Sequence, residues 1–122
     1  MSQTLFIPGP LPVLNDFLGK GTHWPYTNAK KKWYAHIAHH IIEQKLAPMC
    51  CVRFHFIWQE LDRRRDPDNF TAIGKKFILD ALVKCGVMEN DGWANVAGWS
   101  DEWVVIPERP GVLIFMEETN EG

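Results

Sequence analysis

The stretch Cys51-Val52-Arg53-Phe54-His55-Phe56-Ile57-Trp58 decides the fold predicted for this chain of 122 residues. Its aromatic and β-branched residues alternate in part with polar ones, a pattern typical of a β-strand with one buried face. From Phe70 onward, apolar residues recur at helical spacing as far as Cys85, and Gly86 then ends the predicted helix. A strand followed by an amphipathic helix indicates a domain in which the helix packs on a sheet.

The segments on either side extend this pattern. They comprise a short strand at 4–7, a helix at 29–46 capped by Thr27 or Asn28, and two apolar segments at 103–106 and 112–116 that are predicted to form a hairpin around a turn at 107–111. The order β-α-β-α-β-β predicts a mixed α/β fold, with a small mixed sheet and two main helices packed on it. The length fits one domain covering 1–122, with a loose acidic tail from about Glu117.

The composition is that of a soluble globular protein. Apolar residues make up 46% and charged residues 23% of the chain. No stretch approaches the roughly 20 apolar residues that a transmembrane helix needs, so we expect no membrane association. The three cysteines, Cys50, Cys51 and Cys85, cannot all pair, and adjacent cysteines are poor disulfide candidates. We therefore expect a reduced, cytoplasmic protein.

The net charge of −2 hides two halves of opposite sign. Residues 1–65 hold nine Lys and Arg against four Asp and Glu, whereas 66–122 hold four against eleven. The positive half includes two clusters suited to phosphate contacts, unless they are ordinary solvated surface: Lys30, Lys31 and Lys32, and Arg63, Arg64 and Arg65. A predicted long loop at 8–27 adds Asn15 and Lys20 as further candidates for DNA contact.

The chain holds six tryptophans, which is many for its length. Trp33 and Trp58 fall on the apolar faces of predicted elements, so we expect them in the core. Trp24, Trp93 and Trp99 fall in predicted loops, where stacking on bases, a dimer interface and covering of the sheet are all open.

The acids that follow the best-defined strand predict a metal site. Pro67 favours an extended Asp66, and in extended chain Asp66 and Asp68 point the same way. Two adjacent carboxylates repel unless a cation lies between them, and oxygen ligands suit Mg²⁺ or Mn²⁺. The alternative is that Asp66-Pro67-Asp68-Asn69 only makes a turn and caps the next helix.

Further along the same unit are the other parts that metal-assisted phosphodiester cleavage needs. Asp91 supplies a third acid, and Lys75 and Lys76 lie on the helix between. Such cleavage uses carboxylates to hold the ion, the ion to activate water, and a cation near the transition state.

The run Arg63-Arg64-Arg65-Asp66-Pro67-Asp68-Asn69, then Lys76 four positions before Asp80-Ala81-Leu82, then Gly86 and Asp91, resembles the RusA family of Holliday junction resolvases. The resemblance is strongest over 62–92. It implies a homodimeric, Mg²⁺-dependent endonuclease that nicks opposed strands of four-way DNA junctions, with a mixed α/β fold and a bacterial or phage source.

By the same resemblance, Asp66, Asp68 and Asp91 match the metal-binding acids and Lys76 matches the catalytic lysine. Lys75 is the rival, because at 100° per residue it lies about 20° from the direction of Asp68 on a helix that includes both. We thus expect a resolvase acting in recombination and repair. A catalytically inactive DNA-binding accessory protein of the same fold, and a metal-dependent nuclease without junction preference, are the alternatives.

Overall fold

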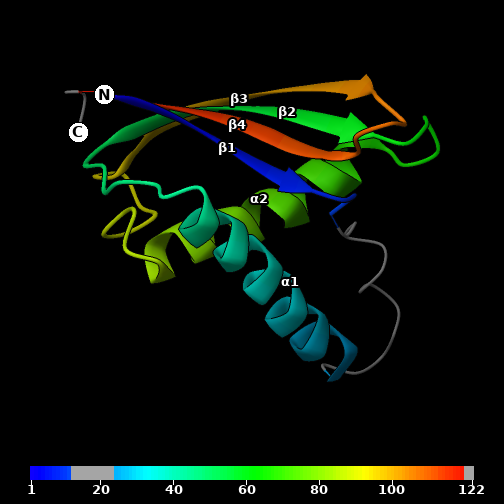
Figure 1. Cartoon of the computed structure of the whole chain (residues 1–122), viewed down its shortest axis with the longest axis horizontal. Coiled ribbons are helices and arrows are strands. Elements are labelled where there is room, and N and C mark those ends of the chain that lie inside the picture. Colours follow the sequence, from blue (N-terminus) through cyan, green and yellow to red (C-terminus); the bar gives the residue numbers. More distant parts are fainter. Residues whose placement is uncertain (12–23, 120–122) are drawn as a thin grey trace.

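The computed structural model describes residues 1–11 and 24–119, and the predicted DNA contacts Asn15 and Lys20 lie outside these ranges. The element order is the predicted one. In chain order the elements are β1 (Ser2–Pro8), α1 (Trp24–Glu43), β2 (Val52–Glu60), α2 (Pro67–Lys84), β3 (Val96–Val105) and β4 (Gly111–Glu118). The mixed α/β fold is thereby confirmed (Figure 1).

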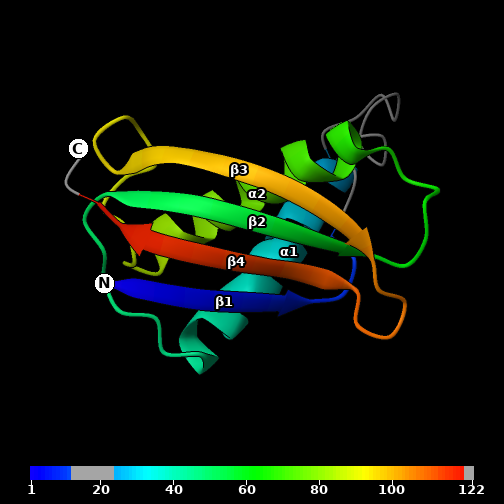
Figure 2. The ribbon, with the colours of Figure 1, turned by 90° about the horizontal axis from the view of Figure 1, so that it is seen from above.

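The sheet order is β1-β4-β2-β3, so the predicted hairpin between the last two strands is wrong. β4 pairs antiparallel with both β1 and β2, whereas β3 pairs parallel with β2 and forms an edge (Figure 2). Burial explains the difference. β4 buries Val112, Ile114 and Met116, which suits a central strand, whereas β3 carries Asp101 and Glu102 and buries none of its ten residues.

Both helices pack on one face of the sheet, and no described helix or strand covers the other face (Figure 1). On β2 the alternate residues Phe54, Phe56 and Trp58 are buried against the helices. The residues predicted for the inner face of α2 are buried as well, in agreement with its helical spacing. Trp58 is 1% exposed and Trp33 is partly buried, as the sequence predicts for core tryptophans.

The starts of α1 and β3 differ most from the prediction. α1 begins at Trp24, inside the segment predicted as a loop, and Pro25 suits the first turn of a helix. β3 begins at Val96, so Trp99 lies in a strand, where Gly98 and the polar residues after it concealed the strand pattern.

Gly74 explains how closely α2 approaches β2. A Cβ at this position would lie 2.8 Å from the indole ring of Trp58, so only glycine lets the helix pack this closely. The contact fixes the first half of α2, which carries the predicted site, against the strand that leads into it.

The state of the cysteines and the hydropathy of the helices can be compared with the expectations from composition. Cys50, Cys51 and Cys85 are all free thiols. Within 1–11 and 24–119, no helix is both long and apolar enough to cross a membrane.

Candidate metal and nucleic-acid site

A cleft of about 420 Å³ opens where β2 ends and α2 begins. It is lined by the end of β2, the connection to α2, the first turn of that helix and the end of β3: Glu60, Asp62, Arg63, Arg65, Asp66, Pro67, Phe70, Trp103, Val104 and Val105. The connection that sequence analysis identified as the chemical centre therefore borders a cleft at this end of the sheet.

Asp66 occupies the N-cap position of α2 without capping it. Its backbone is extended, with φ −75° and ψ 138°, but its carboxylate makes no hydrogen bond to the helix. The helix already begins at Pro67, so Asp68 lies in the first turn and the prediction of extended chain through both acids is wrong. Both carboxylates are nevertheless exposed at one helix N-terminus, where the helix dipole favours negative charge.

The three arginines have different surroundings. The Arg65 Nε lies 3.1 Å from the Glu60 carboxylate, in an ion pair rather than an aligned hydrogen bond, and its guanidinium donates to the Leu11 carbonyl. Arg64 is 89% exposed and lies 3.5 Å from Asp62. Arg63 is exposed and has no ion pair within the described ranges. Arg65 thus builds the wall of the cleft, while Arg63 and Arg64 reach solvent.

Glu60 is a buried acid that sequence analysis did not single out. It is only 6% exposed, and burial raises its pKa above the ordinary value of 4.5, while Arg65 acts in the opposite direction and Asp62 adds to the increase. The cost of desolvating the Glu60 carboxylate therefore outweighs the attraction of its ion pair.

The raised pKa of Glu60 predicts a pH-dependent stability. The folded chain holds this proton more tightly than the unfolded chain, so the contribution of Glu60 to the free energy of unfolding falls as pH rises from 4.5 through the raised pKa. Urea titrations between pH 4 and 7 should show this decrease in the free energy of unfolding with rising pH in the wild type, and Glu60→Gln should lack the contribution. Equal slopes in the two proteins would contradict the assignment.

Lys75 and Lys76 differ sharply in their surroundings. The Lys75 Nζ lies 2.7 Å from the Asp101 carboxylate on β3, and its side chain is only 12% exposed. It also lies 4.7 Å from the ring centroid of Trp99, and Asp101 accepts a second hydrogen bond from Trp58. Lys76 is exposed and has no such partner in the described part of the chain. Lys75 therefore holds α2 against β3, and Lys76 is the lysine available to a ligand.

Lys75→Met is expected to lower the free energy of unfolding by about 3 kcal/mol, because it leaves the Asp101 carboxylate largely buried without its cation. The matched control is Lys76→Met, which removes an exposed lysine one position along the same helix and should change stability by less than about 0.5 kcal/mol. Chemical denaturation of both variants measures the difference, and similar losses would refute the structural role of Lys75.

Asp91 lies at the opposite end of the molecule from Asp66 and Asp68. α2, with 18 residues, is about 27 Å long at 1.5 Å per residue, and Asp91 follows its far end. The pairing of β2 with β3 leads to the same result. Because these strands are parallel, from Val52↔Val96 to Glu60↔Val105, the start of β3 lies beside the start of β2. Asp91 precedes the start of β3, whereas Asp66 follows the end of β2. Figure 2 shows the α2–β3 and β2–α2 connections at opposite ends of the sheet. Within the described residues of one chain, no three His, Cys, Asp or Glu side chains are placed to hold a metal.

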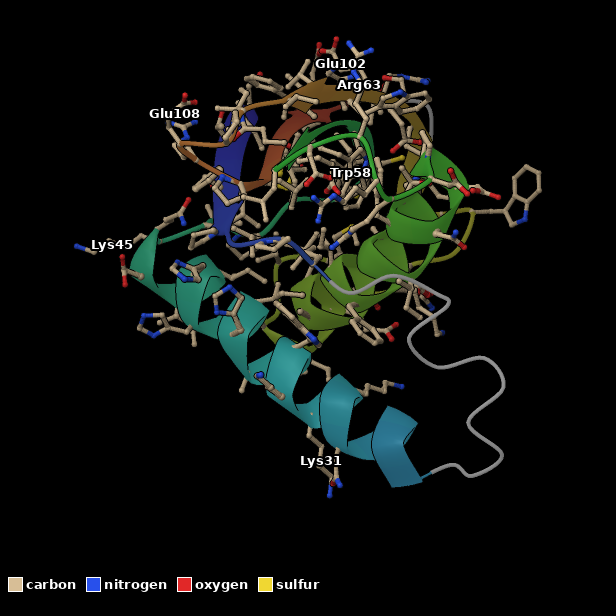
Figure 3. The ribbon with its side chains drawn as sticks, turned by 90° about the vertical axis from the view of Figure 1, so that its right-hand side faces the viewer. Lys31, Lys45, Trp58, Arg63, Glu102 and Glu108 are labelled. Carbon is tan, nitrogen blue, oxygen red and sulfur yellow. The ribbon has the colours of Figure 1, made fainter. Side chains whose placement is uncertain are left out.

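The two basic clusters also lie apart. Lys31 projects from the N-terminal half of α1, far from Arg63 at the sheet (Figure 3). Lys30 lies 3.9 Å from Asp80 on α2, whereas Lys31 and Lys32 are exposed. One continuous phosphate-binding surface through both clusters is therefore not formed by the described residues.

Three tryptophans of the described residues are largely exposed. Trp93 is 97% exposed, and on β3 Trp99 and Trp103 are 51% and 54% exposed. Trp103 borders the cleft, a role that sequence analysis missed because the strand pairing was wrong.

Comparison with models of protein families and with curated proteins finds no match for this chain.

Proposed function

We propose that this protein is a Mg²⁺-dependent endonuclease that resolves four-way DNA junctions by paired nicks, as its resemblance to the RusA family implies. The observation that carries the proposal is the uncommitted carboxylate of Asp66 at the N-terminus of α2. The alternative role for Asp66-Pro67-Asp68-Asn69 was helix capping, and the Asp66 side chain does not cap. Asp66 and Asp68 are thus free to bind a cation beside the exposed guanidinium of Arg63.

In this proposal each group has a separate task. Oxygen ligands from Asp66 and Asp68 suit Mg²⁺, with Mn²⁺ as a substitute, and the ion would supply activation of water and shielding of phosphate charge. Arg63 and Arg64 bind backbone phosphates, for which bidentate guanidinium groups are well suited. Lys76 stabilises the negative charge that develops on the phosphate.

Paired nicks need two sites related by a two-fold axis, so the proposed activity requires a homodimer. The competing proposal is a DNA-binding accessory protein without nuclease activity. One observation favours it, since a single chain does not bring Asp91 to Asp66 and Asp68. A nuclease without junction preference is the third candidate.

The experiment is incubation of the purified protein with a synthetic four-way junction or a linear duplex of matched sequence, in Mg²⁺ or in EDTA. Symmetric nicks on the junction alone, only in Mg²⁺, support the resolvase. Cleavage of both substrates supports the nuclease without junction preference. Binding of the junction without cleavage in Mg²⁺ or Mn²⁺ supports the accessory protein and refutes the proposed activity.

A further inference from the structure

Ser100, His55 and Glu102 form a chain of hydrogen bonds on the face of the sheet opposite the two helices. Ser100 and Glu102 are alternate residues of β3, and His55 lies beside Ser100 on β2. The His55 Nδ1 lies 2.5 Å from the Ser100 Oγ, and the His55 Nε2 lies 2.9 Å from a carboxylate oxygen of Glu102. Figure 3 shows Glu102 on the side of the sheet away from the helices. The three side chains thus meet in the order nucleophile, base and acid that serine hydrolases use.

The Glu102 carboxylate decides which nitrogen of the imidazole carries the hydrogen. A carboxylate only accepts hydrogen bonds, so the His55 Nε2 carries the hydrogen and donates it to Glu102. In the neutral ring Nδ1 then has a lone pair, and the Ser100 hydroxyl donates to it. In this tautomer the imidazole can accept the proton of the serine as a general base.

A pocket of about 330 Å³ opens beside Ser100 on the same face. All four strands contribute to its lining, which includes Ser100, His55, Arg53 and Phe115. Phe115 is 43% exposed and gives the pocket an apolar wall. Glu102 does not line the pocket and therefore supports the imidazole from outside it. A small molecule in this pocket would contact the nucleophile and the base together.

Arg53 brings positive charge to the pocket. It pairs with Gly98, which lies two residues before Ser100 on β3. A Cβ at Gly98 would lie 2.7 Å from the Arg53 Nη1, so glycine at this position leaves room for the guanidinium to lie across β3. The guanidinium is thereby held near Ser100, where the oxyanion of an acyl transfer would form. Glu117 lies opposite Arg53 on β4 and also lines the pocket, so the lining holds one charge of each sign and suits an uncharged substrate.

We propose that Ser100, His55 and Glu102 hydrolyse small uncharged carboxylic esters, an activity separate from the proposed action on DNA. The Ser100 Oγ attacks the ester carbonyl while its proton passes to the His55 Nδ1, and the Arg53 guanidinium stabilises the oxyanion. The bond to the alcohol then breaks, the alcohol takes the proton from His55, and the acyl group remains on Ser100. A water molecule that gives its proton to the same imidazole releases the carboxylic acid and restores the Ser100 hydroxyl.

The first test is labelling with an alkyl fluorophosphonate, which forms a phosphorus–oxygen bond with an activated serine and releases fluoride. Mass spectrometry of proteolytic peptides should locate one label, on Ser100. In His55→Gln the labelling should be about 100-fold slower, as expected for the loss of a general base. Glu102→Gln should lose less, because its carboxylate is 53% exposed. The matched control is Ser2→Ala, which removes the only other serine of the chain, also in the pocket lining, and should be labelled like the wild type.

The second measurement is hydrolysis of p-nitrophenyl acetate, with thermal unfolding to show that each variant is folded. Exposed imidazoles also hydrolyse this ester slowly, so His39→Gln, which removes a histidine that is 66% exposed on α1, measures that background. A burst of product with acetyl-Ser100, absent from folded Ser100→Ala, supports the proposal. An unlabelled Ser100 in the wild type, labelling that His55→Gln leaves unchanged, or hydrolysis that Ser100→Ala leaves unchanged overturns it and leaves the three side chains as cross-strand hydrogen bonds.

Discussion

Asp68→Asn and Asp91→Asn chains, each inactive alone, are expected to recover junction nicking when they are mixed. Each substitution should lower the cleavage rate by more than about 100-fold, since even the outer partners of metal ligands are worth 10- to 100-fold. Recovery follows if Asp91 acts across the two-fold axis. A mixed dimer then contains one site with both substitutions and one site with neither.

The size of the recovery is set by statistics. If the chains exchange freely, half of the dimers are mixed, and about a quarter of all sites are intact. Because each mixed dimer has one working site, its product is a single nick rather than a resolved junction. Gel analysis under native and denaturing conditions separates these products.

The control is Asp62→Asn, which removes a carboxylate from the same cleft without removing a proposed ligand. It should keep cleavage within a few-fold of the wild type. Mixed chains that stay inactive, after exchange is verified by sedimentation of differently tagged copies, would show that Asp91 does not act from the second copy. Full activity of Asp91→Asn alone would remove this residue from the site.

The parts of the fold that depend on local pattern were predictable. The apolar spacing of α2 and the alternation in β2 identified both elements and their buried faces, because each element has enough apolar residues to define its period. β3 was not predictable beyond its last residues. Its polar centre depends on contacts with Lys75 and His55, which are distant in sequence, so local propensity gave no signal there.

The strand order, like the course of β3, depends on contacts between residues that are distant in sequence. A short turn between two apolar segments favours a hairpin, but β4 is the more apolar strand and takes the central place between β1 and β2. That choice reflects burial over the whole sheet. The strand order also decides where Asp91 lies, because Asp91 precedes β3. The wrong prediction of a hairpin between β3 and β4 therefore concealed that Asp91 lies far from Asp66 and Asp68. By contrast, Arg63 and Asp66 border one cleft, and Asp68 lies in the helix turn next to Asp66, because all three are neighbours in sequence.

Lys76→Ala is expected to lower kcat about 100- to 1000-fold, the effect of removing one preorganised group that stabilises transition-state charge. Its KM and its thermal unfolding should change little, because the Lys76 side chain is exposed and has no partner within the described ranges. Lys76→Arg keeps the positive charge and should recover part of the rate. Single-turnover cleavage of a four-way junction at saturating protein measures the chemical step directly.

The neighbouring lysine makes this prediction specific. Lys75→Met should lose stability but keep its rate per folded molecule, because Lys75 is bound to Asp101 and does not reach a ligand. Lys76→Ala should show the opposite, with normal stability and a slow chemical step. The opposite result would be a slow chemical step in Lys75→Met and a loss of stability in Lys76→Ala. It would mean that Lys75, which lies closer to the direction of Asp68 on the helix, is the lysine that acts on the phosphate.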